Sequence, residues 1–236
     1  MNEAQGLRLR PSAAARQRRL DARLREMGRS ADDPRLAEAV EDAQLLGSLQ
    51  LAGIIATWDD VRVSRASGTG LEAILALRRA RAAVDAASPF SVETLGIWHA
   101  AIAGRIGFRR GPRERPGIPP APPELIPERL ATLAEWLAAP SARELRPEQR
   151  AALVLARIVE ILPFDDANGR VSRLAASHLM VAGGMRPPVL VGADRPRLVA
   201  AIESAFRLDT EPLGALLAEA SDRALDVMVQ ALDRGL

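Results

Sequence analysis

Apolar residues recur at helical spacing through most of this 236-residue chain, and strand-like alternation is rare. In the segment 32–61, Leu36, Val40, Leu45 and Leu49 return every four or five residues, and Asp residues with a proline precede them as helix-start signals. Further helices are predicted within 71–87, 91–106, 128–140, 146–161, 169–184, 185–206 and 211–234. The pattern therefore predicts an all-α fold.

Composition narrows the class of protein further. The chain is 48% hydrophobic, enough for one sizeable core with extensions. It has no cysteine, which rules out disulfides and thiolate metal sites and favours a cytoplasmic location. No apolar run approaches the roughly 18 residues of a membrane span, and no apolar signal segment opens the chain. We expect no membrane partner.

The basic charge is concentrated at the N-terminus. The isoelectric point of 10.5 reflects the absence of lysine, tyrosine and cysteine, because the net charge is only +2. Residues 1–30, however, hold eight arginines against three acids. We interpret 1–34 as a basic arm that is solvated, and disordered or helical. A surface for nucleic acid or for an acidic partner, and an Arg-rich transit peptide, are the alternatives.

Two segments interrupt the helical pattern. The sequence RASGTG at 65–70 predicts a loop. Residues 107–127 contain seven prolines and three glycines, which predicts a surface excursion or a short hairpin instead of a helix. Ser91, with Thr94 three residues later, indicates a helix N-cap.

The stretch DDANGRVSR at 165–173 has the properties of a phosphate site. Small residues beside Asn168 let backbone N–H groups turn inward at a helix start, where the helix dipole favours an anion. Arg170 and Arg173 are three residues apart and share a helix face, and Asp166 offers oxygen to Mg²⁺. The alternative is a capped helix start with exposed arginines.

The longer stretch LPFDDANGRVSR resembles the signature of the Fic (Fido) family, most of whose members transfer AMP from ATP to a protein hydroxyl. The resemblance implies an all-α domain in which this loop joins two helices. It also implies ATP and Mg²⁺ as ligands. By resemblance, Leu162 occupies the position of the catalytic His, Asp166 holds the metal, and the nucleotide is bound by Asn168, Gly169, Arg170 and Arg173.

A second resemblance concerns residues 48–61, which are similar to the inhibitory helix of the family. Ser48 and Gly53 fit that motif, but Ala52 stands where relatives carry a Glu that reaches the second motif arginine, here Arg173. The domain organisation implied is the basic arm at 1–34, a Fic/Fido domain at 35–190 and a C-terminal helical extension at 191–236. Within the domain, an inhibitory-like helix covers 36–57 and a target-docking flap covers 107–123.

Leucine has no proton-accepting atom, so Leu162 cannot act as a general base. His99 and His178 are the only histidines, and their helical positions predict satisfied structural roles. Asp165 is the one substitute base beside the loop, and an exposed Asp is a weak base at neutral pH.

These observations favour a degenerate AMP-transferase fold, a pseudoenzyme that binds nucleotide or another phosphate ligand with lost or strongly reduced transfer. One alternative is an active protein adenylyltransferase, or another phosphate-transfer enzyme, that uses a substitute base. Another is a protein-interaction module with a vestigial site. The expected partners are a nucleotide and a protein target at the flap. Nucleic acid is not favoured, although the basic arm leaves it open.

Overall fold

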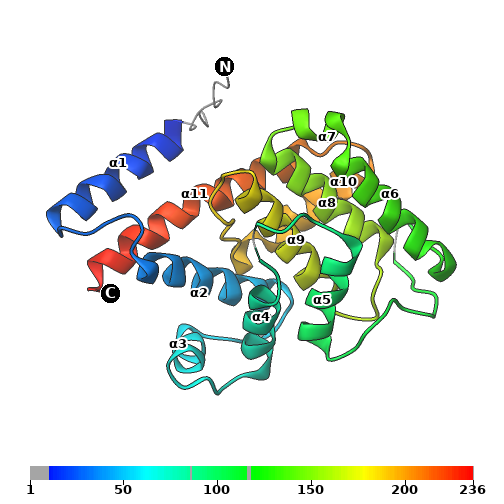
Figure 1. The fold of residues 1–236 in the computed structure, drawn as a ribbon, viewed down its shortest axis with the longest axis horizontal. Coiled ribbons are helices and arrows are strands. Elements are labelled where there is room, and N and C mark those ends of the chain that lie inside the picture. The colour runs from blue at the N-terminus through cyan, green and yellow to red at the C-terminus, as the bar shows by residue number, and fades with distance from the viewer. Residues whose placement is uncertain (1–10, 86, 116–117, 236) are drawn as a thin grey trace.

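The computed structural model describes residues 11–85, 87–115 and 118–235. Within these ranges every regular element is a helix, which confirms the all-α fold (Figure 1). None of the described helices is both long and apolar enough to cross a bilayer. The elements are α1 Pro11–Glu26, α2 Pro34–Leu51, α3 Trp58–Ser67, α4 Glu72–Ala82, α5 Val92–Ala103, η1 Pro123–Leu125, α6 Ile126–Ala138, α7 Pro140–Glu144, α8 Pro147–Ile161, α9 Asn168–Ala182, η2 Gly192–Asp194, α10 Arg195–Phe206 and α11 Glu211–Asp233.

The centre of the molecule is the helix pair α8 and α9. Their apolar faces belong to the largest buried cluster, to which α5, α6, α10 and α11 also contribute side chains. Leu155, Ile158, Phe164 and Met180 are almost completely buried there. Burial of such side chains stabilises the fold by about 1.5–3 kcal/mol each. The loop between α8 and α9 is therefore anchored at both ends in the best-packed part of the chain.

Helix α2 lies along the edge of this core and leads to the site. Its start follows the sequence signals, because the Asp33 carboxylate accepts the Arg35 N–H at 3.0 Å and Pro34 occupies the first turn. A Cβ on Gly47 would lie 1.7 Å from the carbonyl oxygen of Leu190. Only glycine therefore allows α2 to approach this segment.

Several boundaries differ from the sequence-based expectations. The helix expected over 36–57 ends at Leu51, and a separate helix, α3, follows. Part of the loop expected at 65–70 is helical, because α3 continues to Ser67 before Gly68 adopts a left-handed conformation with φ of 66°. A capping box between Thr57 and Asp60 starts α3, a signal that the sequence analysis missed. The Ser91 cap is confirmed, with Thr94 N–H donating at 3.1 Å.

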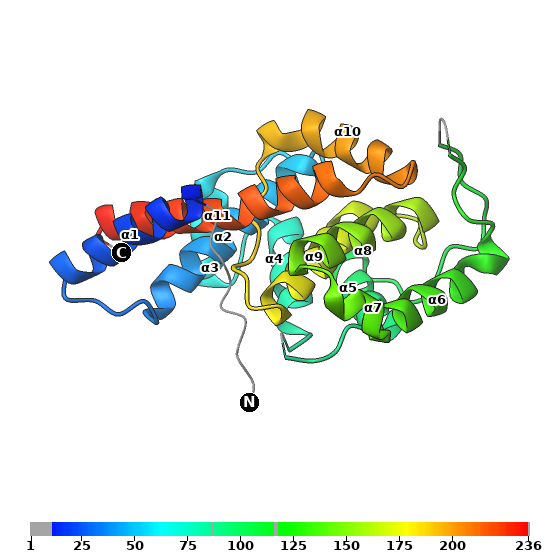
Figure 2. The ribbon, with the colours of Figure 1, turned by 90° about the horizontal axis from the view of Figure 1, so that it is seen from above.

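The segment 107–123 is an irregular excursion, and its described residues contain no strand. Figure 2 shows its described residues at the end of the molecule away from α1. Arg115 holds this segment against α8. Its guanidinium donates to Val159 O at 2.6 Å and to Ile118 O at 2.9 and 3.0 Å. The same guanidinium lies 4.5 Å from the ring centroid of Phe206.

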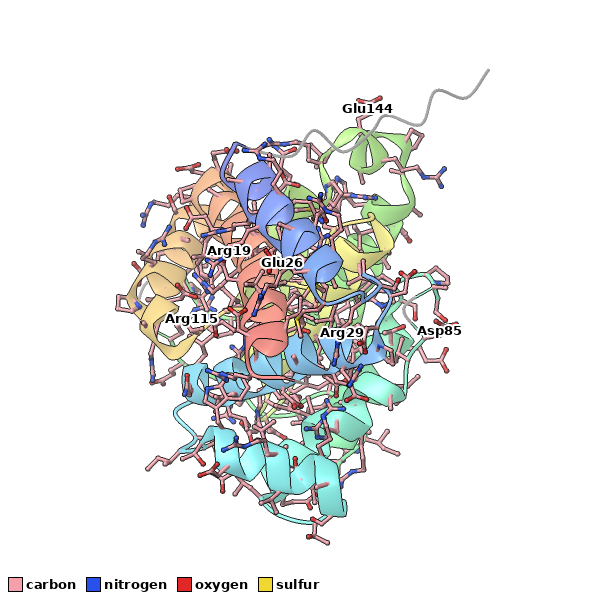
Figure 3. All side chains as sticks on the ribbon, turned by 90° about the vertical axis from the view of Figure 1, so that its left-hand side faces the viewer. Arg19, Glu26, Arg29, Asp85, Arg115 and Glu144 are labelled. Carbon is pink, nitrogen blue, oxygen red and sulfur yellow. The ribbon has the colours of Figure 1, made fainter. Side chains whose placement is uncertain are left out.

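The described part of the basic arm is a helix that packs along α11. Leu20 and Leu24 are buried in a cluster with Leu225, Val229 and Leu232 of α11. Two ion pairs flank this cluster, Arg16 with Asp226 at 3.1 Å and Arg23 with Asp233 at 2.6 Å. Figure 3 faces this end, labels Arg19 and Glu26 on α1, and shows nitrogen and oxygen atoms interspersed over it. Part of the charge of the described residues of the arm is thus balanced by ion pairs with α11. The domain boundaries after residues 34 and 190, which separate the arm, the central domain and the C-terminal extension, stay a prediction from sequence.

Candidate functional site

The site is built on the loop 162–167, which connects α8 to α9. Leu162 and Ala167 at its two ends have positive φ angles of 54° and 63°. Left-handed conformations cost a non-glycine residue on the order of 1–3 kcal/mol. Leu162 still closes α8, because its N–H donates to the carbonyl of Ile158 at 2.9 Å. The shape of the loop is therefore imposed by its surroundings.

Asn168 braces the loop from within. Its Oδ1 accepts the Phe164 N–H at 2.9 Å, and its Nδ2 donates to the Phe164 carbonyl at 2.8 Å. The Phe164 ring is completely buried and stacks on His99, with centroids 3.9 Å apart and planes within 4°. The side chain of Asn168 is therefore engaged within the loop. The donors that the site can offer to an anion are the unpaired backbone N–H groups at the start of α9.

Asp166 and Arg170 form an ion pair at the mouth of the loop. Asp166 Oδ2 lies 3.1 Å from the Arg170 guanidinium, and Oδ1 accepts the Ala167 N–H. This backbone bond and the positive charge of Arg170 hold the pKa of Asp166 below its usual value. The Asp166 side chain is 64% exposed. It is therefore an ionised carboxylate open to a cation.

Arg173 lies deeper and is joined to α2. Its Nε donates to Ser48 Oγ at 3.1 Å and its terminal amino group donates to the Ser48 carbonyl at 2.8 Å. Burial, and then the neighbouring charge of Arg170, lower the pKa of Arg173 to about 10. No carboxylate of the described residues lies within ion-pair distance of it. The position of the family's inhibitory Glu, Ala52, is an exposed helix cap.

A cavity of about 550 Å³ gathers these groups, within the usual range of small-molecule sites. From the loop and α9 its lining comprises Leu162, Asp165, Asp166, Ala167, Asn168, Gly169, Arg170 and Arg173. Helix α2 and the turn after it add Leu51, Ala52 and Ile54, and the flap adds Arg113 and Glu114. Of the site positions named from sequence, Ser48 and Gly53 do not line this cavity. Ser48 lies behind Arg173.

Two arginines of the flap support the site. The sequence predicted the flap but indicated no role for either of them. Arg109 is buried, and its guanidinium donates to Leu162 O at 2.6 Å and also to the Ile161 and Ala121 carbonyls. Its own N–H donates to Pro163 O at 2.9 Å. Burial lowers the pKa of Arg109. Arg113 donates to the Asp165 carbonyl. A single sequence shows no pattern for such contacts, because the Ile161, Leu162 and Asp165 carbonyls are more than 50 residues away from these arginines.

The two histidines lie outside the cavity lining. His178 is satisfied as expected, with Nε2 2.8 Å from Ser88 O and its ring edge-on to Trp98. His99 is buried, and its ring nitrogens make no hydrogen bond of good geometry to a described residue, although the backbone of Arg105 interacts with the ring. Burial lowers the pKa of His99.

No group of three or more His, Cys, Asp or Glu side chains in the described part of the chain could by itself hold a metal ion. Asp166 is paired with Arg170 beside the phosphate-binding groups, and Asp165 and Glu114 also line the cavity. Mg²⁺ commonly binds to proteins through one or two carboxylates together with phosphate oxygens and waters. The donor set therefore fits a cation that arrives with a phosphorylated ligand.

The core is all-α, and the loop leads into α9, whose first turns contain Gly169, Arg170 and Arg173. This arrangement is the fold of Fic domains. Residues 89–180 match the model of the Fic/DOC family. Over these residues the chain is similar to Fic proteins, among them the protein adenylyltransferases described next.

Two adenylyltransferases show the sequence relationship. The protein adenylyltransferase fic-1 of Caenorhabditis briggsae is 30% identical over 113 residues, 48% of this chain and 22% of that protein. The protein adenylyltransferase Fic of Drosophila willistoni is 29% identical over 114 residues, 48% of this chain and 23% of that protein. The matched region is thus less than a quarter of either relative.

Solved structures show the same fold over most of the chain. Residues 134–508 of Fic-1 from Caenorhabditis elegans superpose with a TM-score of 0.74 at 20% identity, covering 93% of this chain and 71% of that one. A Fic-domain signalling protein from Bacteroides thetaiotaomicron gives a TM-score of 0.75 at 17% identity, covering 94% and 98%. At such identities the likeness establishes the fold.

Proposed function

We propose that the protein binds a nucleotide or a similar phosphate ligand in the 550 Å³ cavity and that its AMP transfer is lost or strongly reduced. One observation carries the proposal. Leu162, in the position of the family's base, lines the same cavity as Asp166, Arg170 and Arg173. The groups that would hold phosphate are therefore present, and the group that would start transfer is not.

The charges in the cavity suit phosphates. The Arg170 side chain is only 12% exposed, so its guanidinium would act on a bound anion with little screening by water. The start of α9 adds backbone N–H groups and the positive end of the helix dipole. Asp166 would hold Mg²⁺, which neutralises and orients phosphate oxygens when bound.

Proton removal from a target hydroxyl is the missing function. A positioned general base contributes about 10²–10⁴ in rate, and a leucine side chain supplies none of it. Asp165 favours the second candidate, an active transferase with a substitute base, because it is exposed and lines the cavity. A protein target would meet the cavity at the flap, where Arg113 and Glu114 line its edge.

Titration calorimetry with Mg²⁺–ATP and Mg²⁺–ADP tests the proposal. We expect measurable binding that Arg170→Ala weakens about 10-fold or more, the usual effect of losing a charge-assisted hydrogen bond. Arg129→Ala on α6 is the matched control, since Arg129 is exposed and outside the cavity. No binding at millimolar nucleotide, or equal binding by Arg170→Ala and the control, would show the proposal to be wrong.

Intact-mass analysis after incubation with Mg²⁺–ATP separates the two candidates. The proposal expects no AMP adduct on the wild-type chain. An adduct that disappears in Asp165→Asn and in Asp166→Ala would instead establish the active enzyme with Asp165 as its base.

A further inference from the structure

A second, much smaller cavity of about 40 Å³ lies behind Arg173. Helices α2, α4 and α9 bring five polar side chains to its lining, and the other lining residues are apolar. The polar side chains are Gln44, Ser48, Arg81, Arg173 and Ser177. Two guanidinium groups thus line one small cavity, and no carboxylate is among its lining residues.

Neither arginine has a counter-ion. No carboxylate of the described residues lies within ion-pair distance of Arg81 or Arg173, and Arg81 donates only to the side-chain oxygen of Gln44. Glu41 opposes the lowering of the Arg81 pKa by burial, but the Glu41 carboxylate is engaged by Arg78 at 3.0 Å. Burial lowers the pKa of both Arg81 and Arg173. Both side chains are half-buried, and charges withdrawn from water are costly unless an opposite charge accompanies them.

The uncharged groups add further donors. The Gln44 amide donates to Pro188 O at 2.9 Å and to Ser177 Oγ at 3.2 Å. The hydroxyl oxygens of Ser177 and Ser48 both accept hydrogen bonds, and neither hydroxyl donates one to a described residue. Two hydroxyl hydrogens and two cations therefore face a space that is rich in donors and poor in acceptors.

We propose that this cavity binds a small monovalent anion, with chloride as the fitting species. An anion accepts from the two hydroxyls and the guanidinium groups and supplies the missing negative charge, whereas a water molecule supplies hydrogen bonds alone. The volume exceeds the roughly 10–15 Å³ needed by one water-sized particle and is far below the roughly 300 Å³ of the smallest drug-sized pockets. A nucleotide is thereby excluded from this space, which shares one lining residue, Arg173, with the large cavity.

Thermal unfolding in sodium chloride and in sodium gluconate at equal sodium concentration tests the site without any nucleotide. Chloride should raise Tm along a saturating curve, by about 3 °C or more once its concentration exceeds Kd tenfold. Arg81→Gln should lose this increment. Arg79→Gln, which changes an exposed arginine paired with Glu72 on the same helix, should keep it.

Bromide can replace chloride and be located by its anomalous scattering. We compare the wild-type chain with Ser177→Ala, a variant that removes one hydroxyl but keeps both arginines. Crystals grown in sodium bromide should give an anomalous peak between the Arg81 and Arg173 guanidinium groups, weakened in Ser177→Ala. Equal Tm in chloride and gluconate, or a space without an anomalous peak, would overturn the proposal. The peak decides the matter if Arg81→Gln does not fold.

Discussion

Arg173 donates two hydrogen bonds to one residue of another helix, the hydroxyl and the carbonyl of Ser48, at 3.1 and 2.8 Å. The resemblance to the family suggested that this arginine would meet the inhibitory-type helix, although the Glu that relatives use is Ala52 here. The contact is therefore made without a carboxylate. It orients the guanidinium but leaves its charge uncompensated.

Arg173→Met should make the chain more stable while weakening nucleotide binding. Replacing a buried ionic group by an apolar one of similar volume is often stabilising, and we expect a gain of about 1 kcal/mol in the free energy of unfolding. Urea denaturation in gluconate buffer measures this change, and calorimetry with Mg²⁺–ATP should show at least a tenfold loss of affinity. A variant that is less stable in gluconate than the wild type would contradict the expectation.

Leu162→His should introduce transfer activity. The substitution places an imidazole on the cavity wall, and histidine is found in left-handed conformations more often than leucine. If the phosphate-binding groups are functional, AMP incorporation measured by intact mass should rise about 10²-fold or more over the wild type. Leu162→Asn is the control, because asparagine also tolerates a positive φ but supplies no base. Equal incorporation by the two variants would mean that the imidazole does not act as a base.

Arg109→Met should destabilise the chain strongly. It removes the donor that now reaches the carbonyls of Ile161 and Leu162 at the end of α8 and the carbonyl of Ala121 in the flap. Leaving such buried groups unpaired should cost on the order of 3 kcal/mol in the free energy of unfolding. The adjacent Arg110 is exposed, so Arg110→Met should change stability by less than about 0.5 kcal/mol. Similar urea midpoints for the two variants would refute the role assigned to Arg109.

His99→Phe should remove part of the acid sensitivity of the fold. Burial lowers the pKa of His99, so the native state binds this proton less readily than the unfolded chain, whose histidine titrates near 6.5. As pH falls from about 6.5 toward the native pKa, the free energy of unfolding therefore decreases, by up to about 1.4 kcal/mol per pH unit. Phenylalanine keeps the stacking on Phe164. Urea unfolding at pH 7.5 and 5.5 should show a smaller difference for the variant, and an unchanged difference would exclude His99 as the titrating group.

The sequence predicted the helices well where a long apolar stripe meets the core. The stripes at 128–140, 146–161 and 169–184 correspond closely to α6, α8 and α9. The helix α3 was missed because it buries few side chains and its Gly- and Ser-rich end is typical of a loop. The helix expected over 36–57 was too long, since apolar residues continue past Leu51 into the turn that lines the site.

The site was predictable in its loop and much less so around it. A contiguous motif placed Asp166, Arg170 and Arg173 together, because loop and helix geometry act over a few residues. Arg113 and Arg81 reach the two cavities from distant segments, and Arg109 supports the loop from the flap, so these contacts depend on tertiary packing. His99 shows the same limit. Its helical position predicted burial, but nothing local indicated that its ring nitrogens would make no hydrogen bond of good geometry.

The pairing of α1 with α11 has a consequence for synthesis of the chain. Leu20 and Leu24 emerge from the ribosome about 200 residues before Leu225, Val229 and Leu232, against which they pack. Until then α1 presents an unburied apolar face together with unpaired arginines, and contacts so distant in sequence form slowly. A nascent chain is therefore exposed to mispairing or to chaperone capture at its beginning until the last helix has been made.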